Sequence, residues 1–485
     1  MTTFVARALA AIRGRRSGGV PDPVASVETG EEMVRTADDL ARIFATPCGT
    51  SPIMTDELMR HVRRFSRDEL RAAFTRDPFL SNYVVNHWEF AAGETILTTY
   101  PWRVVVPISD VCNATCTFCN SWLRGVRTLR LEELDRFAEV LRHAAEIGLE
   151  GHGEPLVHPE IETLIHRLTE IVDPRCFKYI ITNGSRLGRL FDVLQKLMIN
   201  TYSISLNAAS AETHQEVMGL GHDAFPGIVE SLKRLVAARN YRRALNPGKL
   251  DEILVNISCV VLSQNIREIP RFIALGNELD VNSIWLRTLL PQSGLLQGLN
   301  YHVLPPYENP DYETYVREAI AAIAQSKVRV VADPASWSAP IFPGSVAEKI
   351  KASPPIFISK DDAKKNQKVD LTVYQDVNFT RCRGRKIAEP TPEEVCGTGN
   401  PFNRSPGYMC ADVYSIWHWN DFLYAIRPCC YMEHPPGYEY LYYDGTYDFF
   451  EAWNSPALVE IRRSLRDGPL ISWCKRCPTQ KQFPV

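Results

Sequence analysis

The sequence predicts an α/β protein built on a partial (β/α)6 barrel of the TIM type. Between residues 99 and 333, short segments rich in β-branched and aromatic residues alternate with longer segments whose apolar residues recur at helical spacing. This alternation indicates parallel strands with helices packed outside them. About six strand–helix units fit within this span, so we expect an open barrel rather than a closed eightfold one.

The strands expected in this barrel are short segments bounded by turn-forming residues. They are Trp102–Ser109, Phe177–Thr182, Thr201–Leu206, Ile253–Leu262 and Ser283–Thr288. The helices expected between and after them are Leu131–Ile147, His158–Ile171, Arg189–Met198, Ile228–Ala238 and Ile266–Leu279. Sites of such folds lie at the carboxyl ends of the strands, so the residues that follow each strand are the first candidates for function.

The segments on either side of the barrel differ from it in composition. Residues 1–98 predict a mostly helical extension, because Glu31–Phe44 and Thr55–Phe74 carry apolar residues at helical spacing. This extension is either a helical cap on the barrel or a substrate-recognition segment. Residues 334–405 are rich in Pro, Lys, Asp and Asn and predict an irregular linker. Residues 406–485 predict a small domain rich in cysteine and aromatic residues.

The composition is that of a large enzyme without a nucleic-acid or membrane partner. The net charge of −3 over 485 residues gives no basic surface for nucleic acid, and no run of apolar residues is long enough to span a membrane. The first segment, Phe4–Arg16, is apolar and then basic, the reverse of a signal peptide. The 13 cysteines are clustered, which favours metal ligands in a reducing cytoplasm over disulfides.

The most specific motif is a loop of three cysteines directly after the first strand. Cys112, Cys116 and Cys119 have the spacing CxxxCxxC. Three thiolates at this spacing can hold three irons of a [4Fe–4S] cube and leave the fourth iron open to another ligand. A structural zinc site would need a fourth Cys or His, and none follows within about twenty residues. The spacing therefore favours an iron–sulfur cluster on which chemistry takes place.

With these residues the region 99–300 resembles the radical S-adenosylmethionine (SAM) superfamily. Phe118 matches the aromatic position of that family's CxxxCxΦC motif. Gly153-Glu154-Pro155 resembles its Gly-Gly-Glu motif after the second strand, with His152 in place of the first glycine. The resemblance implies that SAM chelates the open iron, is cleaved reductively, and yields a 5′-deoxyadenosyl radical that abstracts hydrogen from the substrate.

The resemblance extends to residues at the ends of the later strands. It implies SAM contacts from Asn183 in the sequence Thr-Asn-Gly, from Ser205 and Asn207 to the ribose, and from Val261, near Val260 and Asn265, to the adenine. Arg287 is a candidate partner for a carboxylate of SAM or of the substrate. The cleavage also implies an electron donor of the flavodoxin or ferredoxin type.

A second group of cysteines resembles the short "twitch" form of the SPASM domain, found in radical SAM enzymes. Its ligands to an auxiliary [4Fe–4S] cluster would be Cys410, Cys429, Cys474 and Cys477, with Cys430 as the alternate to Cys429. The same four thiols also suit a structural zinc ribbon. Cys382 and Cys396 are interpreted as ordinary thiols.

The gaps between these ligands are similar to those of the dehydrogenases of aminoglycoside pathways. The resemblance implies dehydrogenation of a sugar, aminosugar or aminocyclitol, with the auxiliary cluster accepting the second electron. Dehydration and epimerisation are alternatives, and Cys259 and Cys430 are candidate hydrogen donors for epimerisation. Peptide modification is a further alternative. A hypothesis from another functional class is that the protein is a non-enzymatic iron–sulfur electron carrier. His152, Glu154 and Asp110 are candidates to take the substrate's hydroxyl proton.

Overall fold

The computed structural model describes residues 34–45, 52–119, 127–151, 153–245, 253–289, 306–332, 337, 410, 412–419, 425–427, 441–471 and 474. Several sequence predictions lie outside these residues. They are nearly all of the linker 334–405 with Cys382 and Cys396, and the site candidates His152, Cys429, Cys430 and Cys477.

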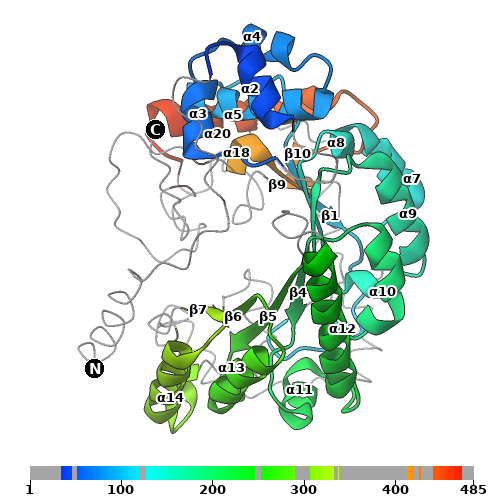
Figure 1. Ribbon diagram of the computed structural model, residues 1–485, viewed down its shortest axis with the longest axis vertical. Coiled ribbons are helices and arrows are strands. Elements are labelled where there is room, and N and C mark those ends of the chain that lie inside the picture. Colours follow the sequence, from blue (N-terminus) through cyan, green and yellow to red (C-terminus); the bar gives the residue numbers. More distant parts are fainter. Residues whose placement is uncertain are drawn as a thin grey trace, which may run out of the picture.

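A curved, mainly parallel sheet forms the centre of the molecule (Figure 1). Its order is β10-β9-β8-β1-β2-β3-β4-β5-β6-β7. The strands β1 to β7 are parallel in chain order, and this confirms the predicted partial barrel. They are β1 (Arg103–Pro107), β2 (Glu146–Glu150), β3 (Phe177–Thr182), β4 (Thr201–Ser205), β5 (Leu254–Val261), β6 (Ser283–Thr288) and β7 (Arg329–Ala332).

The sheet is larger than the six expected strands at both edges. The strand β7 adds a further parallel strand beside β6. On the other edge β8 (Ile416–Trp419) pairs parallel with β1, and β9 (Ala425–Arg427) and β10 (Leu441–Tyr442) continue antiparallel. The carboxyl-terminal segment thus extends the barrel sheet directly.

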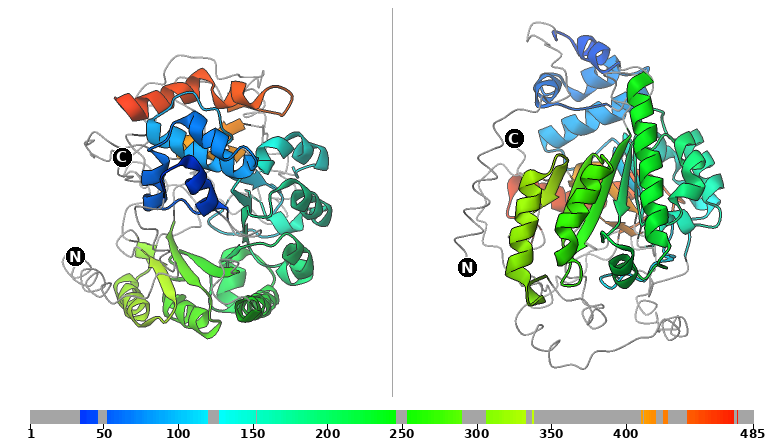
Figure 2. Two further views of the ribbon diagram at one scale, coloured as in Figure 1. Left: turned by 45° about the horizontal axis from the view of Figure 1, so that its top comes forward. Right: turned by 60° about the horizontal axis from the view of Figure 1, so that its bottom comes forward.

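Helices cover the convex side of this sheet (Figures 1 and 2). They are α7 (Leu131–Arg136), α8 (Ala138–Arg142), α9 (Ile161–Ile171), α10 (Leu187–Lys196), α11 (Ala211–Met218), α12 (Ala224–Leu245), α13 (Ile269–Glu278) and α14 (Tyr312–Gln325). The predicted helix Leu131–Ile147 was too long, because Glu146 and Ile147 pair with Arg103 and Val104 in the sheet. Apolar spacing alone does not separate the end of a helix from the start of the next buried strand.

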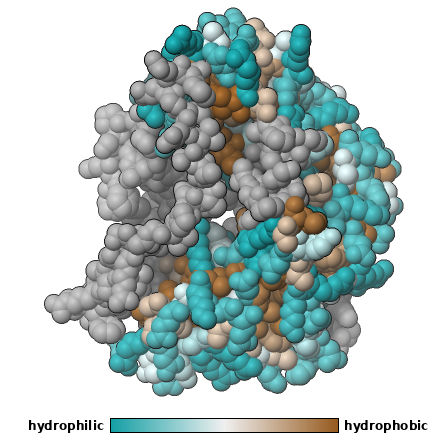
Figure 3. Space-filling view, viewed as in Figure 1, coloured by the Kyte–Doolittle hydropathy of each residue, from teal (hydrophilic) through white to brown (hydrophobic). Residues whose placement is uncertain are grey.

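Alternation along the strands separates an outer face from the barrel interior. On β5 every second residue from Val255 to Val261 is buried, and the residues between them are half-buried. The buried set joins β1 to β6 and the covering helices in one hydrophobic core. The intervening residues face the interior, where polar side chains are tolerated. Hydrophilic residues cover the periphery in the view of Figure 3, and hydrophobic residues gather toward the inner side of the ring.

The described part of the amino-terminal region, residues 34–45 and 52–98, is mostly helical, as predicted. Its helices are α2 (Ala37–Phe44), α3 (Asp56–Val62), α4 (Arg67–Ala73) and α5 (Pro78–Ala92). The helices α2 to α5 begin at side-chain caps, from Thr36, Thr55, Ser66 and Asp77. No described helix is both long and apolar enough to cross a membrane.

The amino-terminal helices pack against the carboxyl-terminal segment, which contains α18 (Asp412–Ser415), α19 (Phe449–Trp453) and α20 (Pro456–Asp467). The Asn86 side chain donates to the Tyr414 carbonyl at 2.9 Å. The Asn454 amide pairs with both backbone groups of Leu97 at 2.8 Å. Figure 2 shows the two segments side by side. Segments from opposite ends of the chain therefore share one packed interface.

Candidate functional site

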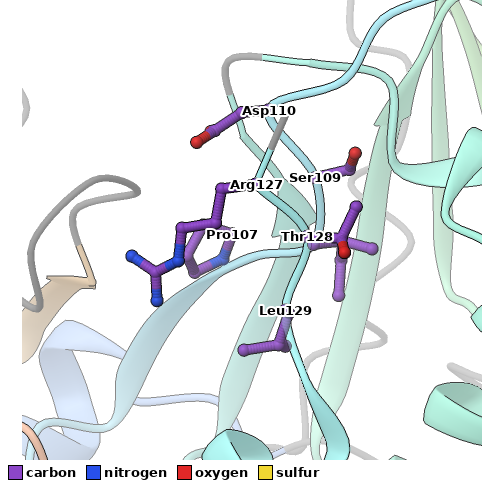
Figure 4. Close-up of a pocket in the computed structure, with 7 residues that line it drawn as sticks. Pro107, Ser109, Asp110, Arg127, Thr128 and Leu129 are labelled. Carbon is purple, nitrogen blue, oxygen red and sulfur yellow. The ribbon is translucent and has the colours of Figure 1, made fainter. Parts of the chain in front are cut away.

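The three-cysteine loop leaves the barrel at the carboxyl end of β1. The Asp110 N–H donates to the Arg127 carbonyl at 2.9 Å, and Ser109 pairs with Thr128, so the loop is closed at its root. This root borders a small hollow, and the Asp110 and Arg127 side chains extend to the same side of it (Figure 4). The hollow is lined by Pro107, Ile108, Ser109, Asp110, Arg127, Thr128 and Leu129.

The three thiols of the loop are half-buried and lie close enough to influence one another. Burial raises the pKa of Cys112 to about 11, and the nearby Glu154 and Cys119 charges add to it. Burial also raises the pKa of Cys116 well above its ordinary value, with Cys119 and Cys112 adding. Neighbouring thiolates repel one another. Binding of a cationic iron–sulfur core would relieve this repulsion and release the protons of the thiols.

The three thiols share one short loop, as ligands of an iron–sulfur cube can. Among the described residues, no three His, Cys, Asp or Glu side chains converge on one metal position. In an iron–sulfur cube each cysteine binds a different iron, so convergence on one point is not required. Cys112, Cys116 and Cys119 are therefore the residues that would hold a [4Fe–4S] cluster.

The Gly153-Glu154 turn after β2 packs directly on the start of this loop. The Gly153 and Glu154 N–H groups donate to the carbonyls of Ser109 and Val111, each at 2.9 Å. A Cβ at position 153 would lie 2.4 Å from the Val111 carbonyl oxygen. Only glycine lets the two backbones approach this closely.

The Glu154 carboxylate connects the turn to the end of β3. It is 2% exposed and accepts hydrogen bonds from the Thr182 hydroxyl, from the Asn183 N–H at 2.6 Å and from the Leu156 N–H at 3.1 Å. Burial raises its pKa to about 6, although these three donors act in the opposite direction. With its oxygens held by the protein, the carboxylate positions the Thr-Asn-Gly turn.

Asn183 continues this connection into the cysteine loop. Its Nδ2 donates to Asn113 Oδ1 at 2.9 Å, and Asn113 Nδ2 donates to Ser185 Oγ at 2.9 Å. Asn183 was predicted from the sequence as a site residue, whereas Asn113 and Ser185 were not. Asn113 lies between Cys112 and Cys116, and Ser185 follows Asn183 by two residues. These positions in the sequence could have identified both as site residues.

The end of α11 supports the loop from the other side. The N–H groups of Thr115 and Thr117 donate to the carbonyls of Met218 and Val217, at 3.0 and 2.9 Å. The Met218 sulfur lies 3.5 Å from Cys116 Sγ and accepts from Asn207 Nδ2 at 2.9 Å. Met218 thus contacts both Cys116 of the loop and Asn207 after β4, and it was not among the residues predicted from the sequence.

The predicted ribose and adenine contacts differ in how they face the interior. Ser205 is half-buried on the interior side of β4. Asn207 is 1% exposed, has φ +58°, and its Oδ1 accepts from the Val260 N–H at 2.8 Å. Val261 is buried toward the helices, whereas Val260 lies on the interior side. Asn207 therefore connects the turn after β4 to β5, whereas Ser205 and Val260 line the barrel interior.

Other predicted site residues lie on or near the same edge of the sheet. Phe118 is partly buried and packs against two small apolar clusters formed with Met218 and Val217. Pro155 is buried in the turn after Glu154. The Arg287 guanidinium lies over the Trp285 ring, 4.5 Å from its centroid, on the interior side of β6.

The remaining described cysteines are separate from the loop. Cys259 is 1% exposed on the outer side of β5, where its sulfur accepts from Asn265 Nδ2 at 3.3 Å and burial raises its pKa. The structure thus places this thiol away from the interior. Cys410 and Cys474 are partly buried against the main core.

The part of the chain that contains this loop is similar to known proteins. Residues 106–257 match the family model of the radical SAM superfamily. A GTP 3′,8-cyclase of Mesorhizobium japonicum is 30% identical over 125 residues, which cover 24% of this chain and 38% of the relative. A probable GTP 3′,8-cyclase of Saccharolobus islandicus is 27% identical over 192 residues, which cover 38% of this chain and 56% of the relative. The chain spans less than two thirds of these curated relatives.

The solved structures that are similar include Streptococcus suis SuiB bound to S-adenosylmethionine. It is 14% identical, covers 88% of each chain and has a TM-score of 0.47. The family match and the cysteine loop at the carboxyl end of β1 agree in position. Residues 106–257, which include this loop, are therefore similar to the radical SAM superfamily domain.

Proposed function

We propose that this chain is a radical SAM enzyme that removes hydrogen from a small polar substrate, a sugar, aminosugar or aminocyclitol, and oxidises it. The observation that supports this most is the meeting of the cysteine loop, the Gly153-Glu154 turn and the Asn183 turn at one edge of the sheet. When bound, a reduced [4Fe–4S] cluster with SAM would supply the radical that breaks an unactivated C–H bond.

The chain's own residues would position and enclose this chemistry. Cys112, Cys116 and Cys119 would hold the cluster, and the backbone of Gly153 and Glu154 would border the amino-acid part of SAM. Ser205 and Val260 would face its nucleoside from the interior sides of β4 and β5. The auxiliary cysteines, Cys410, Cys429 or Cys430, Cys474 and Cys477, would hold a second cluster that accepts an electron, and a ferredoxin-type protein would reduce the first.

Iron analysis and SAM cleavage test this proposal together. Anaerobic reconstitution should give about eight irons per chain if two cubes are present. The triple variant Cys112→Ala, Cys116→Ala, Cys119→Ala should keep about half of this iron and lose all formation of 5′-deoxyadenosine. Continued SAM cleavage by the triple variant would exclude the assignment of the loop. Full retention of iron by the triple variant would also exclude the assignment of the loop.

The type of reaction is tested by the mass of the product. Oxidation removes two hydrogens, epimerisation leaves the mass unchanged, and dehydration removes one water. We expect loss of two hydrogens from a hydroxyl-bearing carbon. An unchanged mass with deuterium incorporated from solvent would instead support the epimerase alternative.

A further inference from the structure

The Met218 side chain lies between a cysteine of the loop and the end of β4. Met218 is the last residue of α11 and is 1% exposed. Its Sδ accepts a hydrogen bond from Cys116 Sγ at 3.5 Å and another from Asn207 Nδ2 at 2.9 Å. The proposed function gives this buried sulfur no role.

Backbone hydrogen bonds hold the end of α11 against the loop whatever side chain residue 218 carries. The Thr115 N–H donates to the Met218 carbonyl at 3.0 Å, and the Thr117 N–H donates to the Val217 carbonyl at 2.9 Å. These two donors belong to the residues directly before and after Cys116. A substitution at position 218 therefore changes what lies against the Cys116 sulfur and leaves the backbone pairing in place.

Apolar side chains surround the two sulfur atoms. The buried members of this cluster are Ala114, Met218 and Leu220, and the partly buried members are Cys112, Cys116, Phe118 and Ala224. Methionine suits such a place, because its unbranched side chain fills irregular space and its sulfur is polarizable. Met218 thus separates the Cys116 sulfur from water on the side of α11.

The second contact of the Met218 sulfur lies at the end of β4. Asn207 is 1% exposed and follows this strand with φ +58°. Its Oδ1 accepts from the Val260 N–H at 2.8 Å, and its carbonyl accepts from Asn265 Nδ2 at 3.0 Å. A continuous line of contacts therefore joins the cysteine loop, through Met218 and Asn207, to the interior side of β5.

The state of the thiol determines what the Met218 sulfur does. In the cluster-free protein Cys116 is a thiol and donates to the thioether. A cysteine that binds iron is a thiolate and has no proton to donate. The thioether carries no donor either, so it would cover the thiolate and exclude water without adding a hydrogen bond to it. Solvent exposure and hydrogen bonds to the sulfurs are among the factors that set the reduction potential of an iron–sulfur cluster.

We propose that Met218 is a positioning residue for Cys116. Its side chain shields this sulfur from water and fixes it against the end of β4. This inference rests on the proposed function for the identity of the bound group, a [4Fe–4S] cluster. The contact itself is present in the cluster-free protein, so it is tested there as well.

Alkylation of the cluster-free protein by iodoacetamide measures the shielding of Cys116. Peptide mass spectrometry would follow the rate at this cysteine in the wild type, Met218→Leu, Met218→Ala and Met59→Ala. Met218→Ala should raise the rate by about tenfold or more, because removal of a buried methionine side chain costs more free energy than a tenfold change represents. Met218→Leu conserves the volume and should change the rate little. Met59 on α3 packs against the main core, and Met59→Ala should leave the rate at Cys116 unchanged.

The reduction potential is the property that a purely structural role would not change. A redox titration of the reconstituted protein with SAM, monitored by electron paramagnetic resonance, follows the cluster with the open iron, because only its spectrum responds to SAM. Met218→Ala should shift its potential to a more positive value, since water beside the thiolate stabilises the more negative reduced state. Met218→Leu should keep the wild-type potential. It should nevertheless unfold at lower urea concentration, because the buried Asn207 amide loses its acceptor.

The outcomes separate this inference from the proposed function. Equal alkylation of Cys116 in the wild type and Met218→Ala overturns the inference, as does an unshifted potential in Met218→Ala. If Met218→Ala holds too little iron for a titration, Met218→Val is measured in its place, with the same expected shift and the same result overturning it. Absence of iron from the reconstituted wild type counts against the proposed function, whereas the alkylation rates still decide the role of Met218.

Discussion

Substitution of Gly153 by alanine should damage the cysteine loop more than its one added methyl group suggests. The new Cβ would lie 2.4 Å from the Val111 oxygen, 2.5 Å from the Asp110 carbonyl carbon and 2.5 Å from the Ser109 oxygen. All three are backbone atoms, so no flexible side chain can move aside. The turn and the loop must separate, which weakens the hydrogen bonds from Gly153 and Glu154 to Ser109 and Val111.

The size of the effect follows from these two contributions. Overpacking of this kind costs about 1–3 kcal/mol. Each weakened backbone hydrogen bond adds about 0.5–1.5 kcal/mol. We therefore expect Gly153→Ala to destabilise this region by about 2–6 kcal/mol in total, enough to lower the occupancy of the first cluster sharply.

Iron content and urea unfolding would measure this prediction. Gly153→Ala should hold about four irons per chain after reconstitution instead of about eight, and should unfold at lower urea concentration. Gly221→Ala is the matched control, because no atom lies within 4 Å of a Cβ at that position. If Gly153→Ala matches Gly221→Ala in iron content and urea midpoint, the steric argument is wrong.

Two further predictions concern parts of the chain outside the loop. Asn86→Ala should lower the stability by about 1–3 kcal/mol, since it leaves the buried Tyr414 carbonyl without its donor. The exposed Gln325→Ala, at the end of α14, should change the urea midpoint little, and equal midpoints for the two variants would contradict the role of Asn86. His214 is fully buried, and burial lowers its pKa to about 4, below the ordinary value of 6.5. The unfolded chain therefore binds this proton first, and stability is lost as the pH falls from about 6.5 toward about 4. His214→Leu should reduce the loss of unfolding free energy between about pH 6.5 and about pH 4 by up to about 3 kcal/mol. If the unfolding free energy of the variant and of the wild type falls equally with pH, the assignment to His214 is wrong.

The secondary structure of the barrel could be predicted because local patterns carry it. The predicted bounds of Phe177–Thr182 and Ser283–Thr288 are those of β3 and β6. Both segments are rich in β-branched and aromatic residues, and this local composition is the signal that identified them as strands. The overlong helix before β2 marks the limit, because Glu146 and Ile147 become strand only through pairing with β1.

The candidate site was predictable where the chain itself brings the residues together. Cys112, Cys116 and Cys119 share one loop, and Gly153 and Glu154 share one turn. Met218 was missed because nothing near it in the sequence indicates a contact with Cys116, 102 residues away.

The sequence by itself determined the alternation of strands and helices and the spacing of the thiols that would bind a cluster. These properties are local, because a periodic pattern and a short loop need no distant partner. Only the tertiary structure decided which distant groups support that loop, and that the two ends of the chain pack together through Asn86, Leu97 and Asn454. Such contacts follow from sheet register and helix packing, which place side chains from separate segments within hydrogen-bond distance.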